Sequence, residues 1–132
     1  MIAVDTNILV RYAMRDDYQQ LETAYRFLHE NECFVLRSVV LELVWVLSSA
    51  YKLSRQDIVG RVRHALRIPT VTTEDVKNVT LALEWYEKGM DFADALHLAV
   101  SIRETDGFST FDKKFANAAK RLDIKQEIYF LQ

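Results

Sequence analysis

Four acidic side chains occupy positions where functional residues of a parallel α/β sheet are usually found. Asp5 and Asp112 each follow an apolar run directly. Asp94 lies in the first turn of an expected helix, and Glu42 lies one turn into another. Because ligands bind at the carboxyl ends of parallel strands, the four carboxylates are expected to share one pocket.

Carboxylates that share a pocket repel one another, which raises their pKa values and destabilises the site. A divalent cation removes this repulsion, and ligation by oxygen alone favours hard ions such as Mg²⁺ or Mn²⁺ over zinc. Such ions activate water and neutralise charge on a phosphoryl group. With several convergent acids and no evident nucleophile, the pattern favours hydrolysis of phosphodiesters.

A simpler hypothesis is that the acids only cap helices. Glu42 is the residue that distinguishes this hypothesis from metal binding. Aspartate is a preferred N-cap residue and is favoured in a first helical turn, so capping accounts for every aspartate in the set. Glu42 has only apolar neighbours from Val39 to Leu47 and no basic residue three or four positions away. A helix that is apolar all round is expected to be buried, and a buried carboxylate is costly unless it is paired or metal-bound.

Short apolar runs alternate with helical patterns along the chain. A short buried strand is expected over residues 2–4, and further strands are expected over 33–36, 70–72, 107–111 and 128–131. Helices are expected shortly after Asp5, over 18–30, 39–51, from 54 to Pro69, 73–89, 91–104, and after Asp112. This alternation predicts an α/β fold whose mostly parallel sheet is covered on both faces.

Residues of particular types mark the expected helix ends. Ser38, Ser54, Thr73 and Asp91 are predicted N-caps, and Asp57 completes a capping box with Ser54. Gly89 is a predicted C-terminal cap.

A length of 132 residues indicates a single domain over residues 1–132, and half of these residues are hydrophobic, which is enough for a sizeable core. A net charge of −2 argues against a protein that binds nucleic acid through a large excess of positive charge. The chain has only three glycines, and they cannot form a Walker loop or a dinucleotide-binding loop. The lone Cys33 allows no intrachain disulfide and is expected in the core. With no evident secretory signal and no membrane-spanning stretch, a cytoplasmic location is expected.

Taken together, the acids resemble those of PIN-domain ribonucleases, and within them the VapC-type toxins of toxin–antitoxin pairs. The resemblance covers essentially the whole chain and rests on four segments: Val4-Asp5-Thr6-Asn7, Ser38 to Glu42, Asp91 to Leu96, and Ser109 to Phe115. It implies a three-layer α/β/α domain with a central, mostly parallel sheet of four to five strands. It also implies that the catalytic and metal-binding residues are Asp5, Glu42, Asp94 and Asp112.

The activity implied by the resemblance is that of an endoribonuclease dependent on Mg²⁺ or Mn²⁺. A homodimer is implied, together with inhibition by a small antitoxin encoded alongside, which forms a hetero-oligomer with the nuclease. Such an antitoxin usually combines a DNA-binding part with a tail that reaches into the acidic groove.

Weaker candidates surround the four acids. The resemblance offers Asp91 as an acidic companion and Thr110 as a supporting hydroxyl. Thr6 and Asn7 could orient a metal-bound water or simply turn the chain, and His97 could face the pocket or be structural. Candidate RNA-binding cations are Arg63, Arg67, Lys113 and Lys114, and the alternative is that each belongs to an ordinary solvated helix face.

Three other functions compete with the nuclease. A haloacid-dehalogenase-like phosphatase also begins with an aspartate after its first strand, but its general acid would fall at Asn7. A receiver domain would need an adjacent acidic pair near the first strand, and none is evident. A non-catalytic binding module remains open, although it leaves Glu42 unexplained.

Overall fold

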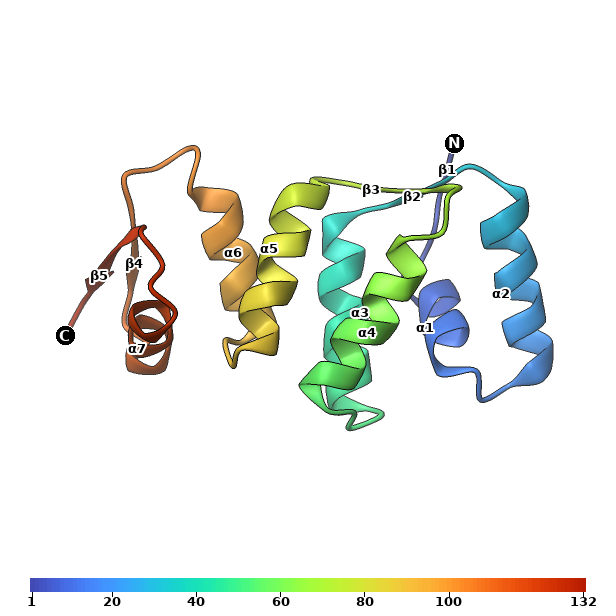
Figure 1. Ribbon diagram of the computed structural model, residues 1–132, viewed down its shortest axis with the longest axis horizontal. Helices are drawn as coiled ribbons and strands as arrows, with labels where there is room; N and C mark the ends of the chain where they lie inside the picture. The colour runs from blue at the N-terminus through green and yellow to red at the C-terminus, as the bar shows by residue number, and fades with distance from the viewer. The chain divides into compact units, whose positions relative to one another are not determined.

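The computed structural model describes all 132 residues and divides into two compact units. The N-terminal unit is Met1–Val76 and the C-terminal unit is Lys77–Gln132. Figure 1 labels the helices and strands in chain order. The single domain expected over residues 1–132 stays a prediction.

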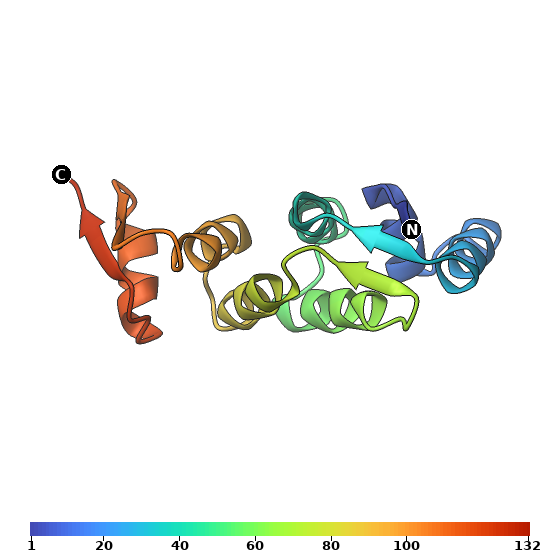
Figure 2. The same cartoon turned by 90° about the horizontal axis from the view of Figure 1, so that it is seen from above.

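The N-terminal unit is built around three short parallel strands. Its elements are β1 (Ile2–Ala3), α1 (Thr6–Met14), α2 (Tyr18–Glu30), β2 (Cys33–Val35), α3 (Arg37–Ser49), α4 (Arg55–Leu66) and β3 (Val71–Thr73). The sheet has the order β1-β2-β3, and Figure 2 shows β2 and β3 as cyan and green arrows that point the same way. Helix α1 packs against α2, α3 and α4.

Side chains from these helices and from the central strand β2 form the hydrophobic core of the N-terminal unit. Its fully buried side chains include Leu9, Leu28, Val35, Leu43 and Ile58. Cys33 is also buried, as expected of a core cysteine. The prediction that the first strand is buried was wrong for Ile2 and Ala3, because β1 forms an edge of the sheet and both residues are exposed.

The C-terminal unit contains a second, smaller parallel sheet. Its elements are α5 (Val76–Glu87, which begins at the last residue of the N-terminal unit), α6 (Phe92–Ser101), β4 (Gly107–Thr110), α7 (Lys113–Arg121) and β5 (Glu127–Phe130). Strands β4 and β5 pair in parallel along their whole length, and α7, which connects them, contacts both. Helix α6 also contacts β4, so α6 and α7 both pack against the small sheet of this unit.

Local signals set most of the helix starts. The side chain of Asp17 accepts a hydrogen bond from the Gln20 N–H at 3.1 Å, and Ser54 accepts one from the Asp57 N–H at 3.1 Å. Helix α2 occupies the predicted residues, and Ser54 is confirmed as the N-cap of α4. Such caps satisfy N–H groups that have no partner within the helix.

Two predicted caps were wrong, because a distant carboxylate bonds to the start of α3 and a turn separates β3 from α5. Helix α3 begins at Arg37, which places Ser38 inside it, and the Arg37 N–H donates to the Glu74 carboxylate at 2.9 Å. Thr73 ends β3 instead of capping a helix, and α5 begins only at Val76. Asp75 lies between them with a positive φ of 54°, a turn that stops the strand from running into the helix.

The predicted α/β fold with parallel strands is confirmed, and all five predicted strands form. The strands nevertheless make two separate sheets, of three and two strands, where one central sheet of four to five was expected. No strand is longer than four residues, and each pairs only with strands of its own unit. None of the helices is long and apolar enough to cross a membrane.

Candidate active site

In the N-terminal unit, Thr6 links two of the predicted acids. Asp5 follows β1 and caps α1, where its carboxylate accepts a hydrogen bond from the Thr6 N–H at 2.8 Å. The Thr6 hydroxyl donates to the carboxylate of Glu42 on α3. Thr6 is buried while both acids are exposed, so one buried residue holds two carboxylates that are 37 positions apart in the chain.

The structure gives Thr6 a role that the sequence did not single out. Orienting a water and turning the chain were the expected alternatives, and the hydroxyl instead fixes Glu42. A buried hydroxyl needs a hydrogen-bond partner, and the carboxylate supplies one. A threonine directly after the first acid was the available signal, but its partner lies too far along the chain to be inferred locally.

The expectation that Glu42 is buried was wrong. Helix α3 buries one stripe, Val40, Leu43, Val44 and Leu47, at the spacing of a single helical face. Glu42 is exposed, and Trp45 on the same helix is 66% exposed. The reason to assign Glu42 a function is therefore its link to Thr6 and Asp5, not the cost of a buried charge.

Asn7 lies beside the first acid. It and Asp5 line the same pocket of about 590 Å³ between α1 and α2. The exposed side chain of Asn7 can therefore reach a ligand held near Asp5.

In the C-terminal unit, helix caps bring three acids together. Asp91 caps α6 and accepts a hydrogen bond from the Asp94 N–H at 3.1 Å. Asp112 follows β4 and caps α7, accepting from the Phe115 N–H at 3.2 Å. Asp94 is half-buried, and its burial raises the pKa of its carboxyl; the negative charges of Asp91 and Asp112 raise that pKa further.

Two neighbours modulate this acidic group. The Thr110 hydroxyl accepts a hydrogen bond from the Asp112 N–H at 2.9 Å, which fixes the backbone at the end of β4. His97 is exposed on α6, and its charge lowers the pKa of Asp94, opposing the larger effects of burial and the two aspartates. The geometry gives Thr110 a supporting position and gives His97 an electrostatic influence on Asp94.

The carboxylates around Asp94 have the chemistry that a hard divalent cation prefers in its ligands. The donor set consists of oxygen atoms alone, and the charges that raise the pKa of Asp94 are those that a cation would offset. No three His, Cys, Asp or Glu side chains form a ready-made metal-binding group. Two of the four predicted acids belong to each unit, so the single four-acid pocket stays a prediction.

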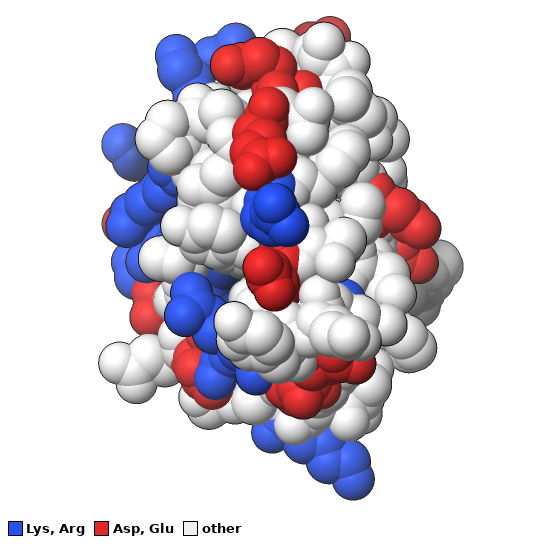
Figure 3. Space-filling model, turned by 90° about the vertical axis from the view of Figure 1, so that its right-hand side faces the viewer, with Lys and Arg blue, Asp and Glu red and all other residues white.

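The candidate RNA-binding cations are distributed over both units. Arg67 is the C-cap residue of α4, and Arg63 lies half-buried one turn before it. Lys113 and Lys114 are exposed in the first turn of α7. On the side of the N-terminal unit that carries α2, Figure 3 shows acidic and basic side chains interspersed. On α2 itself, Arg26 forms ion pairs with Glu22 and Glu30. An RNA role for the four cations stays a prediction.

Parallel strands with an aspartate two residues after the end of β1 and of β4 define an α/β protein with acidic side chains at its strand ends. The model of the PIN domain family matches residues 2–121, a span that includes all four acids, and the chain belongs to this family. PIN domains are generally metal-dependent nucleases that bind RNA. No curated protein matches the chain.

Proposed function

We propose that this protein is a metal-dependent endoribonuclease and the VapC-type toxin of a type II toxin–antitoxin pair, acting in the cytoplasm. Membership of the PIN family supports the nuclease. The observation that carries the proposal is the acidic group around Asp94, where burial and the charges of Asp91 and Asp112 raise the pKa of its carboxyl. A protein that used these acids only as caps would have no need for that repulsion.

In this proposal, the ligands of Mg²⁺ or Mn²⁺ are Asp5, Glu42, Asp94 and Asp112. The bound ion would supply an activated water and neutralise charge on the phosphoryl group. Thr6 holds the Glu42 carboxylate, and Thr110 fixes the backbone of Asp112. These two hydroxyls therefore orient ligands, as partners of ligating residues commonly do.

The proposed partners are a second copy of the chain and a small cognate antitoxin. The resemblance to VapC-type toxins supports both. Trp45 and Phe111 are 66% and 74% exposed. Large exposed aromatic side chains of this kind are common at protein interfaces.

A binding module without activity is the second candidate, and one observation favours it. Asp5, Asp91 and Asp112 each cap a helix through a hydrogen bond to a backbone N–H. Capping does not explain the link between Thr6 and Glu42, nor the half-buried position of Asp94 among like charges.

Cleavage of a mixed RNA pool by purified protein tests the proposal, with Mn²⁺ or Mg²⁺ and with EDTA. Wild type is compared with Asp5→Asn and Glu42→Gln, since asparagine preserves the N-cap at position 5 while removing the charge. Asp17→Asn is the matched control, because Asp17 caps α2 and is not one of the four acids.

Metal-dependent cleavage that is lost in Asp5→Asn and Glu42→Gln and kept in Asp17→Asn supports the nuclease. Equal cleavage by all four proteins identifies a contaminating enzyme. No cleavage, together with no heat of metal binding by calorimetry, would leave the binding module as the function.

A further inference from the structure

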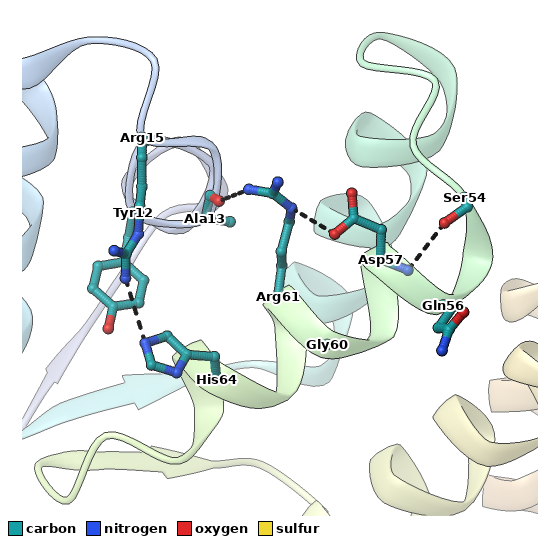
Figure 4. Close-up of a pocket in the computed structure, with 9 residues that line it drawn as sticks. All are labelled: Tyr12, Ala13, Arg15, Ser54, Gln56, Asp57, Gly60, Arg61 and His64. Carbon is teal, nitrogen blue, oxygen red and sulfur yellow. Dashed lines mark hydrogen bonds and ion pairs between the residues drawn. The ribbon is translucent and has the colours of Figure 1, made fainter.

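A second polar pocket lies in the N-terminal unit, between the end of α1 and helix α4 (Figure 4). Its volume is about 630 Å³. The side chains and backbone that line it are Tyr12, Ala13, Arg15, Ser54, Gln56, Asp57, Gly60, Arg61 and His64. None of the four proposed metal ligands lines this pocket, and it contains two arginines and a histidine against one carboxylate.

Arg15 enters this pocket from the end of α1. Its backbone is left-handed, with a φ of 58°, and its N–H bonds to the Arg11 carbonyl at 3.3 Å. The guanidinium lies 5.7 Å from the centre of the Tyr12 ring and 3.5 Å from Nε2 of His64. Arg15 takes part in none of the ion pairs of the structure, so its charge has no carboxylate partner.

Aromatic packing holds this group in place. The rings of Tyr12 and His64 are stacked, with centroids 5.8 Å apart and planes 7° from parallel. Burial raises the pKa of the Tyr12 hydroxyl, so the ring beneath Arg15 stays neutral. Arg15 is therefore positioned by a neutral ring and an imidazole while its charge remains available.

Arg61 faces the same pocket from α4 and is held by two contacts. Its Nε donates to the Asp57 carboxylate at 3.1 Å, and its Nη1 donates to the Ala13 carbonyl at 2.6 Å. Figure 4 shows both contacts and places Arg15, His64 and Arg61 around the cavity. Asp57 is the only acid in the pocket and is already paired, so a net positive charge remains.

Gly60 leaves the α4 wall of the pocket open. A Cβ added at this position would meet no atom within 4 Å. A ligand can therefore approach the helix backbone between Asp57 and His64.

We propose that this pocket binds a backbone phosphate of the RNA strand, a proposal that rests on the nuclease function proposed above. Phosphate oxygens match the planar donors of guanidinium groups, and donors held in advance lose little freedom on binding. The ten residues from Asp5 to Arg15 span about 15 Å at the rise of a helix. A few nucleotides of single strand cover that length, so the pocket would hold the strand outside the cleavage site.

The test measures binding of a short fluorescent single-stranded RNA to protein carrying Asp5→Asn, which blocks cleavage. Adding Arg15→Gln is expected to weaken binding about tenfold and to reduce the slope of log affinity against log salt by about 0.7, the loss of one phosphate contact. Adding Gly60→Glu places a negative charge at the open wall and should weaken binding more than Gly60→Gln, which has the same size. Arg26→Gln is the matched control, because Arg26 is exposed on α2 and paired with Glu22 and Glu30.

Circular dichroism of each variant verifies that it is folded. If Arg15→Gln binds RNA as Arg26→Gln does, with the same salt slope, the phosphate subsite is wrong. In that case, RNA cleavage by the wild-type protein would leave the nuclease proposal intact. A wild-type protein that does not cleave RNA would overturn the nuclease proposal separately. Binding of polyglutamate that depends on Arg15 and is as tight as that of RNA would overturn the phosphate assignment in favour of an acidic peptide.

Discussion

The two units hold their acids by different physical means. In the N-terminal unit, neutral donors fix the carboxylates: the peptide N–H of Thr6 bonds to Asp5, and its hydroxyl bonds to Glu42. In the C-terminal unit, Asp94 stands half-buried among the negative charges of Asp91 and Asp112, which raise its pKa together with burial. Asp5 and Glu42 are both held by hydrogen bonds from Thr6, whereas Asp94 experiences a repulsion that His97 only partly offsets.

In the proposed metal site, this difference would give the two units different parts. Hydrogen bonds from neutral donors orient a ligand before any ion arrives. Repulsion among carboxylates destabilises the metal-free protein and is relieved when a cation binds. The C-terminal unit should therefore dominate the response of stability to metal, while the N-terminal unit should affect mainly the geometry of the site.

Asp94→Asn should produce the largest change, because it removes both a proposed ligand and the charge with the raised pKa. Activity with Mn²⁺ should fall at least about 100-fold, the upper range for residues that only support a metal ligand. Without metal, the melting temperature at neutral pH should rise by a few degrees. Steady-state cleavage rates and thermal melts measure the two effects.

The sign of the stability change follows from the direction of the pKa shift. The folded pKa of Asp94 lies above its unfolded value, so folding favours the protonated form. The stability associated with this group is fully present below the unfolded pKa and is lost as pH rises through the folded pKa. The gain in stability from Asp94→Asn should therefore disappear at acid pH. An equal gain at all pH values would show that it does not come from the charge of Asp94.

Metal addition should give the next largest effect. An ion at one hundred times its dissociation constant stabilises the folded state by about 2.7 kcal/mol. Thermal melts in Mn²⁺ should show this stabilisation in wild type and in Asp17→Asn, and much less of it in Asp112→Asn. A response to Mn²⁺ that Asp112→Asn retains in full would exclude this acid from the site.

Thr6→Val tests the hydrogen-bonded pair of the N-terminal unit. Valine has the same shape but cannot donate to Glu42, so the free energy of unfolding should fall by about 1 kcal/mol and activity about tenfold. Thr6→Ser keeps the hydroxyl and should retain activity, although its lost methyl costs some stability. The bond to Asp5 comes from the backbone and is kept in both variants, so identical activity in the two would show that the hydroxyl is dispensable.

Substitutions at two glycines test whether the units unfold together. Gly60→Ala should raise the free energy of unfolding by about 0.5–1 kcal/mol, since its Cβ meets no atom in α4. Gly89→Ala should lower it by at least about 1 kcal/mol, because Gly89 has a φ of +115°. Each substitution shifts the whole transition if residues 1–132 are a single cooperative domain.

Fluorescence reads each unit separately, because Trp45 belongs to the N-terminal unit and Trp85 to the C-terminal unit. Replacing either with Phe leaves the other as the only reporter. If Gly60→Ala moves only the transition reported by Trp45, and Gly89→Ala only that reported by Trp85, the single-domain prediction is wrong.

Much of this protein was determined by the sequence alone, wherever the signal acts over a few residues. The caps at Asp5, Ser54, Asp91 and Asp112 form as expected, because each bonds to an N–H within its own helical turn. The five strands and helix α2 fall where apolar spacing put them. Family membership was also visible, since it depends on the order of the acids along the chain.

Only the tertiary structure decided which groups meet across long separations. The Arg37 N–H is satisfied by Glu74, and Glu42 is held by Thr6, with 37 and 36 positions between the partners. An apolar helix such as α3 does not specify which of its faces is covered, so the exposure of Glu42 could not be predicted from its neighbours in sequence. Strand pairing depends likewise on which segments the packed helices bring together, and here it divided five predicted strands between two sheets.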